Sequence, residues 1–130
     1  ALPRFLSELD IAVVMLPLTP ETRRLLGRDM LSALPAGAKL INVSRGAVVD
    51  EQALLEALKS GHIAEATLDV FETEPLPPEH PFWTMENVLI TPHLASVALP
   101  RSAAQQIAEN IRRVRSGREV LNRVDPRRGY

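Results

Sequence analysis

The chain has 130 residues, a formal net charge of −1, 45% hydrophobic and 24% charged residues, and no cysteine. This length suits one globular domain, and the lack of cysteine excludes disulfides, thiolate nucleophiles and cysteine-containing zinc sites. The balanced charge, the absence of a long apolar run and the absence of a signal-peptide pattern lead us to expect a cytoplasmic protein without a metal centre, a membrane partner or a nucleic-acid partner.

A strand and three short helices are predicted at the start of the chain. Apolar residues at positions 2, 5, 6 and 9 indicate the end of a helix. Residues 11–16 form an uninterrupted apolar run, which is typical of a parallel strand buried on both faces. Thr19 and Pro20 then predict a helix start, Gly27 predicts its end, and residues 28–34 follow as another short helix.

Three further apolar runs predict strands at residues 38–43, 66–71 and 88–91. Residues 72–83 are rich in proline and have no periodicity, so we expect a long loop there. Long loops inside compact domains are often functional.

Two longer helices are predicted in the remaining segments. Asp50 is expected to cap the first, which ends at Gly61. Its apolar stripe comprises Ala53, Leu54, Ala57 and Leu58. The second helix is expected from Pro100 to Gly117. Its apolar stripe comprises Ile107, Ala108, Ile111 and Val114.

Strands that alternate with helices predict an α/β fold with a mainly parallel sheet. Such sheets bind ligands beyond the carboxyl ends of their strands. Arg45 follows the second predicted strand, Glu72 and Glu74 follow the third, and His93 follows the fourth. We therefore expect an arginine, a carboxylate and a histidine to meet at one edge of the sheet.

These residue types suit one reaction. A guanidinium can hold a substrate carboxylate and polarise the adjacent carbonyl, and a histidine beside a carboxylate can pass a proton near neutral pH. Reduction of a 2-keto acid then needs only a cofactor that supplies hydride. Other interpretations remain open: Arg45 as a surface residue of a turn, His93 as a capping or packing residue, and either Glu72 or Glu74 as the acid that faces the cleft. Trp83 is expected to anchor its loop by packing.

Four motifs in order carry a family resemblance. They are LPLTPET at residues 16–22, INVSRG at 41–46 with Val49 and Asp50 behind it, LDVF at 68–71 with Glu74 and Pro75 behind it, and ITPH at 90–93. Together they resemble the D-isomer-specific 2-hydroxyacid dehydrogenases. The ending, with Val124-Asp125 and residues 128–130, is most similar to the glyoxylate/hydroxypyruvate reductase branch of that family.

The resemblance implies the C-terminal half of a Rossmann-type parallel-sheet dinucleotide-binding domain, and it implies roles for single residues. Arg45 would bind and polarise the keto acid. Glu74 would pair with His93 and favour its protonated form, and His93 would donate the proton as hydride reaches the carbonyl carbon. Asp69 would hold the nicotinamide amide. The residues expected to contact NADP or NAD are Pro17, Thr22, Val43, Ser44, Arg45, Asp69 and His93.

The chain departs from the family in lacking the phosphate-binding Gly-x-Gly-x-x-Gly motif. Residues 1–116 are expected to be the C-terminal part of the NAD(P)-binding domain, and residues 117–130 a tail towards a substrate domain that this sequence does not contain. We expect a parent oxidoreductase that acts on a small 2-keto acid, glyoxylate or hydroxypyruvate, while the chain alone is inactive. The alternative is a non-catalytic α/β fragment that folds or associates without binding cofactor. Residues 11–16 would form a bare sheet edge, so a homo-oligomer such as a dimer is expected.

Overall fold

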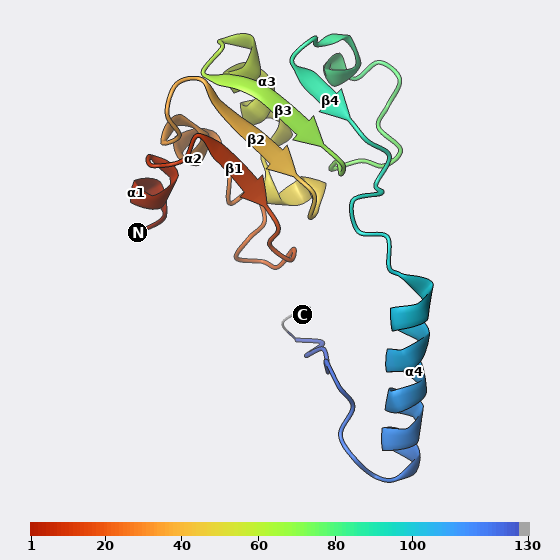
Figure 1. The fold of residues 1–130 in the computed structure, drawn as a ribbon. Coiled ribbons are helices and arrows are strands. Elements are labelled where there is room, and N and C mark those ends of the chain that lie inside the picture. Colours follow the sequence, from red (N-terminus) through yellow and green to blue (C-terminus); the bar gives the residue numbers. More distant parts are fainter. Residues whose placement is uncertain (128–130) are drawn as a thin grey trace. The chain divides into compact units, whose positions relative to one another are not determined.

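The computed structural model describes residues 1–127 and divides the chain into two compact units, Ala1–Ala95 and a second unit that begins at Ser96. The first unit contains one parallel sheet (Figure 1). Its strand order is β1-β2-β3-β4. The strands are β1 (Ile11–Val14), β2 (Ala38–Asn42), β3 (Ile63–Leu68) and β4 (Val88–Ile90). The α/β fold predicted from the sequence is confirmed.

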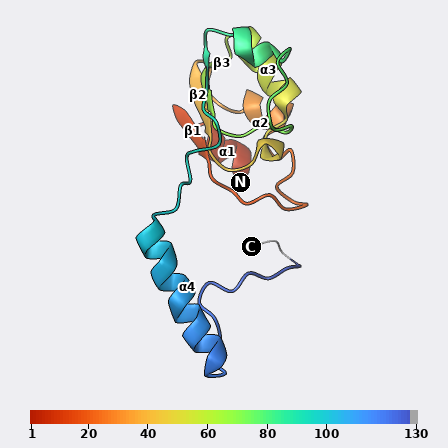
Figure 2. The same ribbon diagram turned by 90° about the vertical axis from the view of Figure 1, so that its right-hand side faces the viewer.

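Helices cover one face of this sheet (Figure 2). They are α1 (Leu2–Leu6), α2 (Arg28–Ser32) and α3 (Glu51–Lys59), accompanied by two 3-10 turns, η1 (Gly46–Val48) and η2 (Pro81–Thr84). The predicted cap of α3 is confirmed, because the Asp50 side chain accepts a hydrogen bond from the Ala53 amide at 3.0 Å. The core between this layer and the sheet includes the fully buried side chains of Leu31, Leu40, Leu54, Ile63 and Phe82. Burying a side chain of this size contributes about 2 kcal/mol.

The second unit contains the predicted long helix, α4 (Pro100–Arg115), which starts at a proline and is followed by Gly117 at φ +67. Glu109 forms ion pairs with Arg112 and Arg113 on its surface. Ile107, Ile111 and Val114 of its apolar stripe are exposed, Ala108 is partly exposed, and no residue of α4 is buried. Among residues 1–127, no helix is long and apolar enough to span a bilayer. The end of the expected tail, residues 128–130, lies outside the described residues.

The helix predicted to start at Thr19 and Pro20 and to end at Gly27 is wrong, because this segment folds as a turn. The Thr22 hydroxyl donates to the Pro17 carbonyl and accepts from the Thr19 amide, both at 2.7 Å. Threonine hydroxyls compete in this way with helical backbone hydrogen bonds. Arg24 then adopts a left-handed φ of 51°, which no helix interior allows.

The third strand was predicted three residues too late, because β3 begins at Ile63 and ends at Leu68. Ile63 is fully buried and pairs with Ala38 of β2. Glu65 interrupts the apolar pattern of this strand, but its carboxylate forms an ion pair with Lys39 of β2 at 2.8 Å. The apolar pattern used for the prediction broke at Glu65, whereas the cross-strand ion pair allows this charged residue to lie within the strand.

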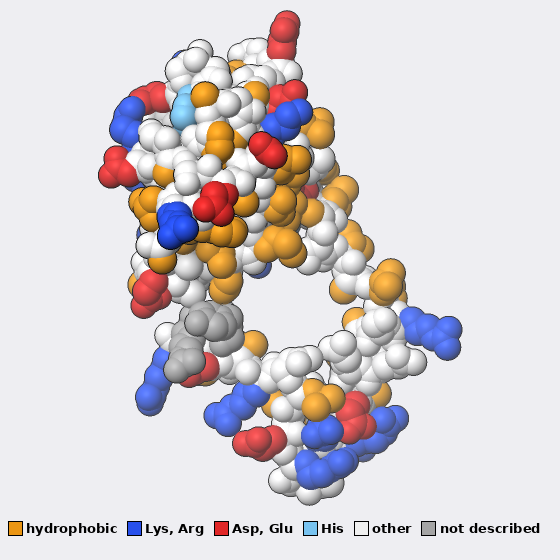
Figure 3. Space-filling view, turned by 60° about the vertical axis from the view of Figure 1, so that its left-hand side comes forward, with side chains coloured by type: hydrophobic (Ala, Val, Ile, Leu, Met, Phe, Trp, Pro, Cys, Tyr) orange, Lys and Arg blue, Asp and Glu red, His pale blue; other side chains and the backbone are white. Residues whose placement is uncertain are grey.

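The expectation that the first strand is buried on both faces is also wrong for this unit. Ile11 and Val13 are about half exposed, while Ala12 and Val14 point into the core. The expected edge position is confirmed, since β1 has β2 as its one neighbour among the described residues. Figure 3 shows hydrophobic side chains gathered on the surface of this unit. The exposed members nearest this strand are Ile11, Val13, Met15 and Leu16.

Gly46 marks the point where the loop after β2 touches the loop after β3. A Cβ atom at Gly46 would lie 1.9 Å from the Phe71 carbonyl carbon and 2.3 Å from the Glu72 nitrogen. Backbone atoms cannot move aside as a flexible side chain can, so the close approach of the two loops requires glycine here.

We expect Gly46→Ala to lower the free energy of unfolding by about 3 kcal/mol, because the methyl group would push the two loops apart. Urea unfolding followed by circular dichroism measures this change. Gly27→Ala is the matched control, since a Cβ there would meet its nearest atom at 3.5 Å, an ordinary contact. Equal unfolding midpoints for the two variants would contradict this account of the packing.

Candidate active site

The predicted site residues lie in the segments that follow the four strands, at one edge of the sheet. Pro17 and Thr22 belong to the segment after β1, and Arg45 follows β2. Glu74 lies beyond β3, and His93 follows β4. Because parallel strands end at the same edge, segments far apart in the sequence come together there.

Asn42, the last residue of β2, orders the turn that carries Arg45. Its buried side chain accepts hydrogen bonds from the Ser44 amide at 3.1 Å and the Ser44 hydroxyl at 3.0 Å. It also donates to the Arg45 carbonyl at 3.1 Å. Sequence reasoning missed Asn42, although a polar residue at the end of an apolar strand was a visible signal. The Arg45 guanidinium donates to the Ser44 carbonyl through Nη1 at 2.6 Å.

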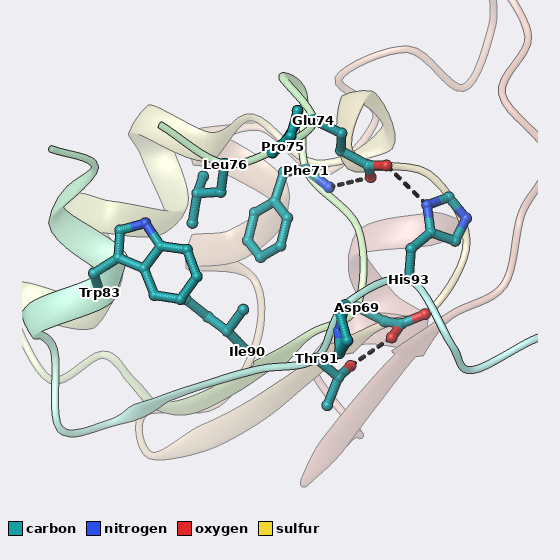
Figure 4. A pocket seen from close by; sticks show the side chains of 10 residues that line it. Asp69, Phe71, Glu74, Pro75, Leu76, Trp83, Ile90, Thr91 and His93 are labelled. Carbon is teal, nitrogen blue, oxygen red and sulfur yellow. Dashed lines mark hydrogen bonds and ion pairs between the residues drawn. The ribbon is translucent and has the colours of Figure 1, made fainter. Parts of the chain in front are cut away.

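Glu74 and His93 form a direct pair (Figure 4). One Glu74 oxygen lies 2.8 Å from Nδ1 of His93, and the other accepts the Phe71 amide at 2.9 Å. The hydrogen bond from His93 lowers the pKa of Glu74, with further lowering from the Phe71 amide and the positive charge of Arg45, while burial opposes the shift. Glu74 is therefore ionised at neutral pH and only accepts hydrogen bonds, so Nδ1 of His93 carries the hydrogen.

The contact with Glu74 uses only Nδ1 of His93, so the other ring nitrogen, Nε2, is free to contact a ligand. Among the contacts of residues 1–127, Nε2 makes no hydrogen bond, and the side chain is 46% exposed. The geometry also separates the two glutamates. Glu72 contacts Arg24 at 3.1 Å, whereas Glu74 contacts His93.

Asp69 fixes the segment around His93. It is only 2% exposed, and its carboxylate accepts from the Thr91 hydroxyl and from the amides of Leu94 and Ala95, both at 2.9 Å. Burial acts to raise the pKa of Asp69, but these hydrogen bonds outweigh it and lower the pKa. His93 sits within this segment at a left-handed φ of 55°. The expected contact of Asp69 with the nicotinamide amide stays a prediction.

The remaining residues expected to contact the cofactor make internal hydrogen bonds. The Thr22 hydroxyl is bound to Pro17, as described above, and the Val43 amide donates to the Val14 carbonyl at 3.3 Å. Ser44 is buried with its hydroxyl on Asn42. These contacts place Pro17, Val43 and Ser44 at the correct edge of the sheet, and their roles towards NADP or NAD stay predictions.

A cavity of about 450 Å³ opens beside the Glu74–His93 pair (Figure 4). Its lining also includes the apolar side chains Phe71, Leu76, Trp83 and Ile90. Trp83 donates from its indole nitrogen to the Pro77 carbonyl at 2.9 Å. Trp83 is 52% exposed, so the expectation that it anchors its loop by packing is wrong; it holds the loop through this hydrogen bond and also lines the cavity.

Asp69→Asn should lower the free energy of unfolding at pH 7 by about 2 kcal/mol. The substitution replaces one carboxylate oxygen by an NH2 group, which cannot accept the hydrogen bond that this oxygen receives. The folded pKa of Asp69 lies below the ordinary value of about 3.9. The stabilisation is therefore present above about pH 4 and is lost as the pH falls through the folded pKa. Urea unfolding at pH 7 and pH 3 should show the gap between native chain and variant closing in acid.

The exposed Asp29→Asn serves as control for that measurement, with little effect at either pH. A gap for Asp69→Asn that stays constant down to pH 3 would show that the ionised carboxylate is not what holds this segment.

Several solved structures similar to this chain hold a bound cofactor. A D-isomer specific 2-hydroxyacid dehydrogenase from Xanthobacter autotrophicus Py2, in complex with NADPH and MES, is 68% identical with a TM-score of 0.97 over 100% of this chain and 54% of that one. An NADPH-dependent glyoxylate/hydroxypyruvate reductase from Sinorhizobium meliloti, in complex with NADP and sulfate, is 39% identical with a TM-score of 0.93 over 99% of this chain and 42% of that one.

Among curated proteins, glyoxylate/hydroxypyruvate reductase A of Yersinia enterocolitica is 46% identical over 99% of this chain and 41% of its own length. The protein of the same name from Serratia proteamaculans is 47% identical over 97% of this chain and 40% of its own length. The chain thus spans less than half the length of these relatives. The family model described as D-isomer specific 2-hydroxyacid dehydrogenase, NAD binding domain, matches residues 1–95. The chain therefore belongs to the D-isomer specific 2-hydroxyacid dehydrogenase family, and its residues 1–95 match the NAD-binding domain of that family.

Proposed function

We propose that this chain forms the catalytic half of the cofactor domain in an NAD(P)-dependent reductase of small 2-keto acids. The observation that carries the proposal is the Glu74–His93 pair at 2.8 Å, with Nε2 of His93 available and Arg45 on the same edge of the sheet. A non-catalytic fragment gives no reason for a carboxylate to hold one ring nitrogen of an exposed histidine and leave the other free.

Each of the three side chains has one task in this proposal. The Arg45 guanidinium binds the substrate carboxylate and draws electrons from the adjacent carbonyl. Glu74 accepts the hydrogen on Nδ1 and so orients the His93 ring. His93 donates a proton from Nε2 to the carbonyl oxygen during reduction and takes it back during oxidation.

The cofactor in this proposal is NADP or NAD. When bound, it supplies the hydride that no side chain can supply. A nicotinamide site at this edge is supported by Asp69, which binds the amides beside His93, and by the segments of Pro17 and Ser44, which follow β1 and β2 at the same edge of the sheet. The chain lacks the glycine motif that holds a pyrophosphate, so other parts of a complete protein must provide that cradle. The relatives solved with NADPH or NADP support this choice of cofactor.

Glyoxylate or hydroxypyruvate is the proposed substrate, supported by the names of the curated relatives. The alternative of a non-catalytic fragment is less well supported, because it assigns no purpose to the Glu74–His93 geometry. A homo-oligomer is part of the proposal, since β1 is a sheet edge without any charged residue. The cytoplasmic location and the assignment of residues 96–116 to the cofactor domain stay predictions.

A chimera tests the function. This chain would replace the matching segment of the Yersinia enterocolitica reductase, which is 46% identical to it. We expect NADPH oxidation with glyoxylate or hydroxypyruvate within about tenfold of the host enzyme, because the substitution retains each catalytic group. The chain alone should show neither turnover nor saturable NADPH binding at micromolar concentration, since it has no pyrophosphate cradle. A folded chimera that binds NADPH but reduces neither acid would refute the proposal.

In that chimera, His93→Gln should reduce kcat by about two to four powers of ten through loss of the general acid. Arg45→Lys should reduce kcat/KM by about 10- to 100-fold, because a point charge does not reproduce the bidentate fork. NADPH affinity, measured by fluorescence titration, should change little in either variant. His62→Gln is the control, since His62 precedes β3 at the opposite end of the strand. Near-normal turnover by His93→Gln would remove His93 from the mechanism.

A further inference from the structure

Glu51, the first residue of α3, contacts the loop that carries Glu74. One of its carboxylate oxygens accepts a short hydrogen bond from the Glu72 amide, and the other lies 3.9 Å from Nε2 of His80. The Glu51 side chain is only 18% exposed. It therefore reaches both the start and the later part of a long loop from a rigid helix.

The hydrogen bonds of two neighbouring amides make this contact important for the site. The Phe71 amide donates to Glu74, and the next amide, that of Glu72, donates to Glu51. The two planar peptides are joined at the Phe71 Cα, so only the φ and ψ of Phe71 separate them, and an anchor on one plane limits the positions that the other can take. A shift of Glu51 would therefore move the Glu72 amide, and through it the adjacent Phe71 amide that orients the Glu74 carboxylate towards His93.

Other contacts hold the same stretch of backbone. Arg24 contacts the Glu72 side chain at 3.1 Å and lies 3.8 Å from Asp50, the cap of α3. Gly46 packs directly against the backbone of Phe71 and Glu72. The Arg24 ion pairs are exposed, and such pairs contribute little, so the less exposed Glu51 carries the restraint on the Glu72 amide.

We propose that Glu51 is a positioning residue, which holds the Glu72 amide so that the Phe71 amide and Glu74 align with His93. Its effect on turnover rests on the proposed function, whereas its effect on the Glu74–His93 pair does not. The competing role for Glu51 is purely electrostatic, as a negative charge at the start of α3 or beside His80. Positioning requires an acceptor oxygen at the right reach, while the electrostatic role requires the charge.

Two substitutions separate these roles. Glu51→Gln keeps the reach and an acceptor oxygen but removes the charge, and Glu51→Asp keeps the charge but shortens the side chain. NMR on the 130-residue chain measures amide exchange at Phe71 and Glu72 and the ring nitrogen shifts of His93, with His93→Gln used for assignment. Gln52→Ala is the matched control, since Gln52 is exposed and contacts Glu56 within the same helix.

We expect Glu51→Asp to accelerate exchange at Phe71 and Glu72 by about tenfold and to shift the His93 ring signals towards those of a free histidine. Amides inside α3 such as Leu54 should keep their exchange rates, and Glu51→Gln and Gln52→Ala should match the native chain. If Glu51→Gln changed the exchange rates and the His93 ring shifts while Glu51→Asp left them native, the electrostatic role would be established and the proposal overturned. Equal acceleration across α3 would overturn it too, because the residue would then only stabilise the helix.

The active chimera adds a kinetic measurement. Glu51→Asp should reduce kcat by about tenfold with little change in KM for NADPH, and Glu51→Gln should restore kcat. An inactive chimera would refute the proposed function but leave the NMR result valid. An active chimera in which both variants keep native kcat would refute the positioning role alone.

Discussion

The close approach of two loops at Gly46 is the constraint on which the candidate site depends. A parallel sheet brings the ends of β2 and β3 to one edge, but it does not bring the loops beyond them into contact. The missing side chain at Gly46 allows the Arg45 turn to rest directly on the backbone of Phe71 and Glu72. That contact places a guanidinium near enough to Glu74 for its charge to help lower the pKa of the carboxyl group. The parallel sheet places Arg45, Glu74 and His93 at one edge, and Gly46 allows the loops that carry Arg45 and Glu74 to come into contact.

Carboxylates that accept backbone hydrogen bonds hold the loops at this edge. Asp69 binds the amides of Leu94 and Ala95, Glu74 binds that of Phe71, and Glu51 binds that of Glu72. Hydrogen bonds to ionised acceptors are stronger than neutral ones, and they satisfy amides that no strand or helix partners. The loops are thereby held by side-chain carboxylates, while Nε2 of His93 makes no hydrogen bond within residues 1–127.

Sequence reasoning predicted the elements whose formation depends on local pattern. The apolar runs located all four strands, Asp50 and Gly61 delimited α3, and the rule for parallel sheets placed Arg45 and His93 at one edge. The failures came from contacts that no local pattern shows. The hydroxyl of Thr22 converts an apparent helix into a turn, and an ion pair from Lys39 allows Glu65 to lie within a strand. The contact of Glu51 with Glu72 spans 21 positions of sequence and was invisible for the same reason.

The structure separates the two halves of the proposed chemistry. His93, which is proposed to transfer the proton, Glu74, which contacts it, and Asp69, which binds the neighbouring amides of Leu94 and Ala95, all lie within one compact unit. Hydride transfer depends on a cofactor whose pyrophosphate this chain has no motif to hold. The half-exposed Ile11 and Val13 indicate that the first strand is suited to a sheet covered on both faces. A segment that covers this face of β1 and holds the cofactor would supply what hydride transfer needs. It would leave the contacts of Glu74, His93 and Asp69 unchanged, because none of those contacts involves the exposed face of β1.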